Sequence, residues 1–159
     1  MEDVKKFIEW ALRRAKKSSV PKGAQLLIPT SEVGSVTEAE YMWGTNGATI
    51  TQKILDARFK THYSKNGWTR AEFNAATKGW VEAKKKVTDC QGLLDWYMGN
   101  DTNANGNYVS YCTEKGLMTS IKREYVIGEA VFNGTDSKKT HVGWICGFMS
   151  NGDPLVVEA

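Results

Sequence analysis

The chain has 159 residues, of which 41% are hydrophobic and 25% are charged, a composition typical of one globular domain with a sizeable core. Its net charge of +3 permits polyanionic partners such as nucleic acid, teichoic acid or anionic lipid without requiring one. No apolar run approaches the length that crosses a bilayer, and the N-terminus lacks the apolar core of an export signal. We therefore expect neither stable membrane insertion nor export in this form.

The first helix is predicted over residues 3–17, where apolar residues recur at helical spacing opposite a face of lysines and arginines. A basic amphipathic helix either lies on a membrane surface or packs on the domain with its basic face in solvent. The packed helix is the favoured interpretation. Residues 18–36 follow as a loop rich in serine, proline and glycine, with a short buried stretch at 25–28.

Residues 49–87 are predicted to form a polar, helical segment that carries many lysines. Two of its aromatic residues, Trp68 and Trp80, either stack on sugars or anchor the segment to the core, and anchoring is favoured. His62 lies in the same segment without a recognisable partner, so the sequence assigns it no role.

The remainder of the chain is predicted to contain two helices followed by strands. The helices are expected over 90–98 and near 106–116, and the strands over 128–132, 141–148 and 155–159. Helices that precede antiparallel strands along the chain are typical of an α+β fold. We therefore predict a single domain over residues 1–159.

The loop between these two helices begins with a pattern found in calcium-binding loops. Asp101, Asn103, Asn105 and Gly106 match its first positions, but the glutamate expected at the twelfth position is Cys112. Without that ligand, a turn that caps the following helix is the preferred interpretation.

Three widely spaced cysteines argue against both a disulfide framework and a zinc site. Cys146 lies in an apolar strand, where a small buried side chain is expected. Asp89 is placed to cap the helix that follows it, so Cys90 falls in the first turn. Unpaired N–H groups and the helix dipole at that position favour a thiolate, which makes Cys90 a candidate nucleophile.

A thiol nucleophile needs a base, and the chain has only two histidines. His141 opens one predicted strand, and Glu158 lies on the next predicted strand. A cysteine at a helix start, a histidine on a strand and a polar orienting residue follow the arrangement of thiol acyl-transfer enzymes. The predicted catalytic residues are therefore Cys90, His141 and Glu158.

Four short motifs in this order resemble the NlpC-type cysteine peptidases, which are papain-like peptidoglycan hydrolases of bacteria and phages. The motifs are Tyr41-Met42-Trp43-Gly44, Asp89-Cys90-x-Gly92-Leu93, His141-Val142-Gly143 and Val157-Glu158-Ala159. The resemblance covers residues 41–159. It implies a minimal papain-like fold, in which the nucleophile helix packs on an antiparallel sheet that carries the histidine. It also implies cleavage of stem-peptide amide bonds, commonly between D-γ-glutamyl and a diamino acid, without a metal or other cofactor.

The resemblance implies a role for each matching position. Cys90 matches the nucleophile, His141 the general base and Glu158 the polar residue that orients the imidazole. Tyr41 matches a tyrosine that lies beside the nucleophile and helps to bind substrate. The backbone N–H of Cys90 is an expected oxyanion donor.

The other substrate-binding residues that we predict are Trp43, Asp89 and Gln91. Gln91 replaces a serine that is usual in the family, which leaves open whether free L-Ala ends are recognised. The insertion over 49–87 is longer than the matching segment of many relatives, and a wall or lid over the cleft is one expectation for it. Family members usually continue beyond the strand that carries Glu158, so we also expect a longer native chain.

The expected function is that of a peptidoglycan hydrolase acting on stem peptides at the bacterial cell wall, with no nucleic-acid partner. It is either a phage endolysin released from the cytoplasm or a secreted wall enzyme. Two functions of other classes remain open. One is a non-catalytic wall-binding module that keeps the fold, and the other is a thiol acyltransferase or deamidase acting on lipid or protein.

Overall fold

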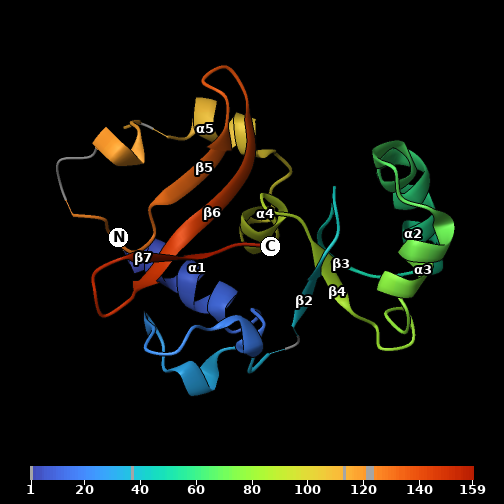
Figure 1. Ribbon diagram of the computed structural model, residues 1–159, viewed down its shortest axis with the longest axis horizontal. Coiled ribbons are helices and arrows are strands. Elements are labelled where there is room, and N and C mark those ends of the chain that lie inside the picture. The colour runs from blue at the N-terminus through green and yellow to red at the C-terminus, as the bar shows by residue number, and fades with distance from the viewer. Residues whose placement is uncertain (1, 37, 113, 121–123) are drawn as a thin grey trace.

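A four-stranded antiparallel sheet forms one end of the molecule, as Figure 1 shows. The computed structural model describes the whole chain except residues 1, 37, 113 and 121–123. The longest strand pairs with β1 and β5 along one edge and with β7 along the other. The four strands are β1 (Gln25–Leu26), β5 (Ala130–Gly134), β6 (Lys139–Phe148) and β7 (Pro154–Val157).

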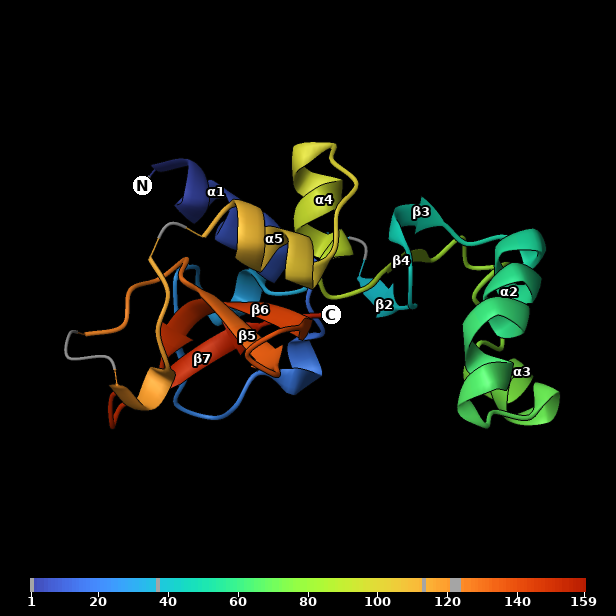
Figure 2. The ribbon, with the colours of Figure 1, turned by 90° about the horizontal axis from the view of Figure 1, so that it is seen from above.

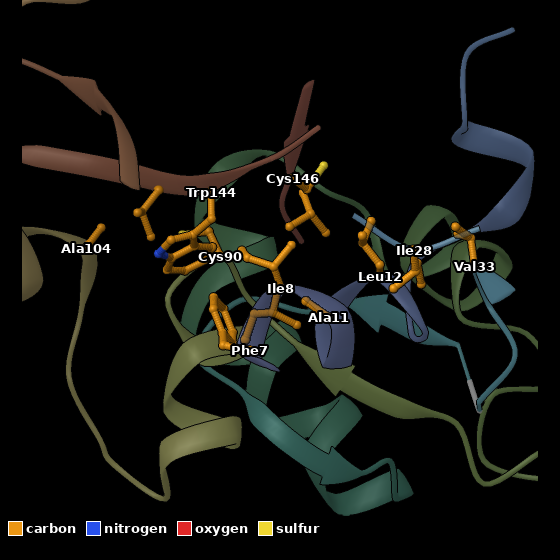
Figure 3. Packing of buried hydrophobic residues seen from close by; sticks show 13 residues of the cluster. Phe7, Ile8, Ala11, Leu12, Ile28, Val33, Cys90, Ala104, Trp144 and Cys146 are labelled. Atoms are coloured by element: carbon orange, nitrogen blue, oxygen red, sulfur yellow. The ribbon is translucent and has the colours of Figure 1, made fainter. Parts of the chain in front are cut away.

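Three helices accompany this sheet: α1 (Glu2–Leu12), α4 (Gly92–Met98) and α5 (Ala104–Ser110). α1 and α5 contact β6, and α4 contacts α1. The main hydrophobic core lies between these elements and includes Phe7, Ile8, Leu93, Val142 and Trp144. Figure 3 shows Cys90 among the side chains of this core.

A second, three-stranded sheet consists of β2 (Ala39–Tyr41), β3 (Asn46–Thr49) and β4 (Lys86–Thr88). β2 runs parallel to β4, whereas β3 runs antiparallel to it. The mixed α and β content agrees with the predicted class, but the predicted order, helices first and strands last, is wrong here. β4 is only three residues long, so it shows no alternating pattern that sequence could distinguish from the end of a helix.

The predicted helical segment over 49–87 is confirmed in its middle part. It contains α2 (Gln52–Arg58), a π-helical turn (Phe59–Tyr63), a 3₁₀ turn (Ser64–Asn66) and α3 (Arg70–Ala76). Gly67 and Gly79 adopt positive φ angles of 87° and 76°, and these left-handed residues end the helical stretches.

This insertion has a hydrophobic cluster of its own, distinct from the main core. The cluster contains Met42, Ile50, Leu55, Phe73 and Val87. Trp80 packs against this separate cluster and not against the main core to which it was expected to anchor the segment, whereas Trp68 is 41% exposed. Both views place α2 and α3 at the opposite end of the molecule from β5, β6 and β7, with the small sheet between them (Figures 1 and 2).

The first helix ends at Leu12, several residues before its predicted end at residue 17. The backbone N–H groups of Gly34, Val36 and Ala39 bind the carbonyls of Leu12, Arg13 and Arg14, respectively. These bonds from the loop satisfy carbonyls at the C-terminal end of the helix, and the Leu12 carbonyl also accepts the N–H of Ala15 in a tighter last turn. The apolar face of α1 is buried in the main core, which confirms the packed-helix interpretation.

The other predicted elements are found with shifted ends. The helix predicted near 106–116 is α5, which ends at Ser110, and residue 113 lies outside the described part of the chain. The side chain of Asn103 accepts a hydrogen bond from the N–H of Gly106 at 2.9 Å, which confirms the predicted helix-capping turn. In the described ranges, no helix is both long and apolar enough to cross a membrane.

We predict that Gly92→Ala destabilises the fold by about 2–3 kcal/mol, because the new side chain would overpack a tight contact. A Cβ on Gly92 would collide with the backbone carbonyl oxygen of Thr45 and approach Asp89 Oδ1 to 2.9 Å. Urea unfolding measures the loss. Gly116→Ala is the matched control, since a Cβ there meets nothing within 4 Å. An equal effect of the two substitutions would contradict the prediction.

Candidate active site

The turn that carries Cys90 is fixed by both carboxylate oxygens of Asp89. Oδ1 accepts a hydrogen bond from the N–H of Gly92, the first residue of α4, at 2.7 Å. The N-cap residue of α4 is Gln91, so Cys90 precedes the helix and the prediction that it lies in the first turn is wrong. Oδ2 accepts one from the N–H of Gly44 at 2.8 Å and thereby ties the Tyr41–Gly44 segment to this turn. Asp89 was predicted to bind substrate, but the structure gives it this positioning role.

Cys90 is 8% exposed, and its thiol lies within the main hydrophobic core. Burial raises the pKa of the Cys90 thiol, although the backbone N–H groups of Val142, Gln91 and Cys90 itself act in the opposite direction. The sequence predicted a thiolate at this position, which requires a lowered thiol pKa. The pKa is raised instead, because the loss of solvation outweighs the stabilising effect of the N–H groups. The contact with Val142 places the sulfur beside the residue that follows His141.

His141 and Glu158 form the predicted base and orienting pair. His141 Nε2 lies 2.7 Å from Glu158 Oε2, and the two side chains are 36% and 55% exposed. The pairing of β6 with β7 sets this contact, since Trp144 lies opposite Val157. Gly143 makes room for it, because a Cβ there would collide with Val156 and approach the Cβ of Glu158 to 3.2 Å.

His141 and Glu158 thus form a pair, and Val142, the residue after His141, lies next to the Cys90 thiol. The C-terminal end of the chain, which carries Glu158, lies beside the start of α4 in both views (Figures 1 and 2). A carboxylate that accepts a hydrogen bond from Nε2–H favours the tautomer in which Nδ1 of His141 is unprotonated. That nitrogen is then the free base of the pair.

Tyr41 lies near the thiol of Cys90, the predicted nucleophile. Its side chain is 48% exposed, and its pKa is raised to about 12, first by burial of the hydroxyl and then by the charge of Cys90. The phenol therefore stays protonated at neutral pH and is a hydrogen-bond donor next to the thiol.

Trp43 contacts the insertion, for which a wall or lid over the cleft was one expectation. Its ring stacks on His62 with centroids 4.3 Å apart and an interplanar angle of 4°, and its backbone N–H donates to the Tyr63 hydroxyl at 3.3 Å. His62 and Tyr63 both belong to the π-helical turn, a rare conformation that shifts the direction of the side chains after it. No local sequence signal marks such a turn, so these two residues were missed.

Gln91 was predicted to contact substrate, but it is only 3% exposed. Its Nε2 donates to Asp95 Oδ1 at 3.0 Å, and its Oε1 accepts from Asn107 Nδ2 at 2.9 Å. Asp95 and Asn107 are also buried, so the three side chains satisfy one another and link α4 to α5. Gln91 therefore holds the nucleophile turn in place and is not available to substrate.

A pocket of about 530 Å³ lies between α1 and β7 and is lined mainly by apolar side chains. Tyr41 and Glu158 line it, whereas Cys90 and His141 do not. The pocket therefore lies next to Glu158, the predicted orienting residue. The part of the chain that the structure describes contains no group of three or more His, Cys, Asp or Glu side chains arranged to hold a metal ion.

Comparisons with known proteins add no family assignment. No family model matches the chain, no curated protein matches it, and no solved structure matches it.

We expect alkylation of Cys90 by iodoacetamide to accelerate steadily as the pH rises from about 6 to about 9, because only the thiolate reacts. Burial raises the pKa of this thiol, so the neutral form dominates at low pH and the thiolate fraction grows as the pH increases. Peptide mapping by mass spectrometry measures the rate at Cys90. A rate that is already constant from about pH 5 upward would contradict the prediction and indicate a preformed thiolate–imidazolium pair.

Proposed function

We propose that this protein is a cysteine peptidase or amidase with a minimal papain-like fold, and that it hydrolyses stem-peptide amide bonds of bacterial peptidoglycan at the cell wall. One observation carries the proposal. His141 Nε2 lies 2.7 Å from Glu158 Oε2, and Val142, the next residue along β6, has its backbone N–H next to the Cys90 sulfur. The likeness of the four motifs to NlpC-type peptidases supports the choice of substrate.

The proposed reaction begins with proton transfer from Cys90 Sγ to Nδ1 of His141, which has Glu158 hydrogen-bonded to its other nitrogen. The sulfur attacks the scissile carbonyl carbon, a C–S bond forms, and negative charge develops on the oxygen. The backbone N–H of Cys90 stabilises this oxyanion, and the protonated phenol of Tyr41 is a second nearby donor.

The tetrahedral intermediate collapses when the C–N bond breaks and the imidazolium of His141 protonates the leaving amine. Water then attacks the thioester, with His141 taking its proton. The C–S bond breaks, a carboxylic acid leaves, and the thiol of Cys90 is restored. Glu158 keeps the imidazole in one tautomer through both halves of the reaction, as an orienting carboxylate does in related triads.

A synthetic stem peptide that joins a D-γ-glutamyl residue to a diamino acid, incubated in ¹⁸O-labelled water, tests the proposal. Hydrolysis places one heavy oxygen in the new carboxyl group of the acyl product, and the diamino acid appears with a free amine. Mass spectrometry detects both products. An intact peptide after prolonged incubation with the unmodified protein would contradict the proposal.

A thiol acyltransferase is the second candidate, and the apolar pocket beside Glu158 favours it. Tyr41 and Glu158 line this pocket and Cys90 does not, and its apolar walls are suited to an acyl chain or another hydrophobic part of an acyl donor. In that case an added amine acceptor, and not water, would take the acyl group from Cys90. The labelled-water experiment separates the two functions, because transfer to an amine leaves no heavy oxygen in the product.

A further inference from the structure

The insertion reaches the nucleophile turn through Arg58, the last residue of α2. A Cβ on Gly44 would lie 2.8 Å from Nη1 of Arg58, so the guanidinium covers this glycine directly. The N–H of Gly44 donates to Asp89, which precedes the nucleophile Cys90. Two short contacts therefore connect the guanidinium to the catalytic turn.

Arg58 is partly buried, and among the described residues it has no carboxylate partner. The nearest acid in the sequence, Asp56, binds Arg70 at 2.9 Å and Gln52 at 3.2 Å. The nearest acid at the turn, Asp89, uses both oxygens for backbone N–H groups. A partly desolvated guanidinium with free N–H donors is favourable only if an anion or water completes its hydrogen bonds.

The wall around Arg58 is held in place before any substrate binds. The Arg58 guanidinium lies 5.9 Å from the ring centroid of Trp43, and the Trp43 ring stacks on His62. The Tyr63 hydroxyl accepts a hydrogen bond from the Trp43 backbone N–H. Burial raises the pKa of Tyr63, and the nearby charge of Arg58 partly offsets this rise. These contacts restrict Arg58 and reduce the entropy lost when it binds a ligand.

We propose that Arg58 binds a free carboxylate of the substrate next to the scissile bond, on a wall formed by Trp43 and the backbone of Gly44. The planar guanidinium matches a carboxylate through two parallel hydrogen bonds. A γ-linked glutamyl residue leaves its α-carboxylate free near the amide that is cut, so it presents the required group. This inference rests on the proposed peptidase function and specifies the substrate that the site selects.

Two synthetic peptides test the inference, one with a γ-linked glutamate whose α-carboxylate is free and one with the α-carboxamide in its place. We expect the unmodified protein to cleave the carboxylate peptide with a kcat/KM about 10- to 100-fold higher, as expected for a charge-assisted hydrogen bond. Arg58→Gln should lower kcat/KM for the carboxylate peptide by the same factor and leave the carboxamide peptide unchanged. Lys53→Gln is the matched control, because it removes one exposed positive charge from the same helix.

Equal cleavage of the two peptides by the unmodified protein would overturn the carboxylate site and leave the peptidase function standing. An equal loss on both peptides in Arg58→Gln would also overturn it, since that result indicates a packing role for Arg58. If neither peptide is cleaved, calorimetric binding to the Cys90→Ala protein decides. Tighter binding of the carboxylate peptide, lost when Arg58→Gln is added, would support the site alone, whereas equal binding or none would overturn the site together with the function.

Discussion

Replacing Cys90 by alanine is expected to lower kcat/KM for stem-peptide hydrolysis by on the order of 10⁴-fold or more, because no other group can form the thioester. The sulfur lies beside the N–H of Val142 and is 8% exposed, so its loss leaves only a small gap in the core. We therefore expect the free energy of unfolding to change by about 1 kcal/mol or less. Steady-state kinetics and urea unfolding measure the two effects separately.

Cys146→Ala is the matched control for this experiment. Cys146 is also buried, at 3% exposure, and its thiol donates to the carbonyl of Leu155 at 3.4 Å, away from the proposed chemistry. Its substitution should alter stability to a similar degree and leave hydrolysis intact. If both cysteine variants kept full activity, Cys90 would be an inert core thiol and the proposed mechanism would be wrong.

Replacing His141 by alanine is expected to reduce kcat/KM by roughly 10³- to 10⁴-fold, because the thiol then loses its general base. Glu158→Ala should cost much less, about two- to fivefold. The Glu158 side chain is 55% exposed, and solvent-exposed charged pairs contribute about 1 kcal/mol or less. The same substrate and conditions serve for both variants, so the two losses compare directly.

Glu158→Gln refines this comparison, since the amide oxygen still accepts a hydrogen bond from His141 Nε2. It should retain more activity than Glu158→Ala. Equal activity of Glu158→Ala and the unmodified protein would show that another group orients the imidazole. A loss in Glu158→Ala as large as that in His141→Ala would show that water does not replace the carboxylate.

The positions of the proposed catalytic residues could be predicted from sequence because local rules place each of them. Asp89 binds the N–H of Gly92 at the start of α4, and this contact fixes the turn that carries Cys90. His141 and Glu158 lie on neighbouring strands separated by a short turn, so antiparallel pairing alone brings them together. Sequence alone could not predict that the pKa of Cys90 is raised, because this shift depends on burial by residues distant in the chain.

The surroundings of the site depend on long-range contacts, and sequence reasoning missed most of them. Gln91 resembles an exposed polar residue until Asp95 and Asn107 are brought next to it. The contact between Trp43 and His62 requires both the small sheet and the π-helical turn. Neither feature leaves a periodic pattern, since β4 is short and a π-helical turn differs from α-helix by only one residue.

Digestion of purified peptidoglycan tests the central claim most directly. The unmodified protein and the Cys90→Ala variant are incubated with the same wall preparation, and mass spectrometry identifies the soluble products. Stem-peptide fragments with new amine and carboxyl ends, released only when Cys90 is present, are the result that we predict. Equal release by both proteins, or no fragments from either, would contradict the proposed peptidase.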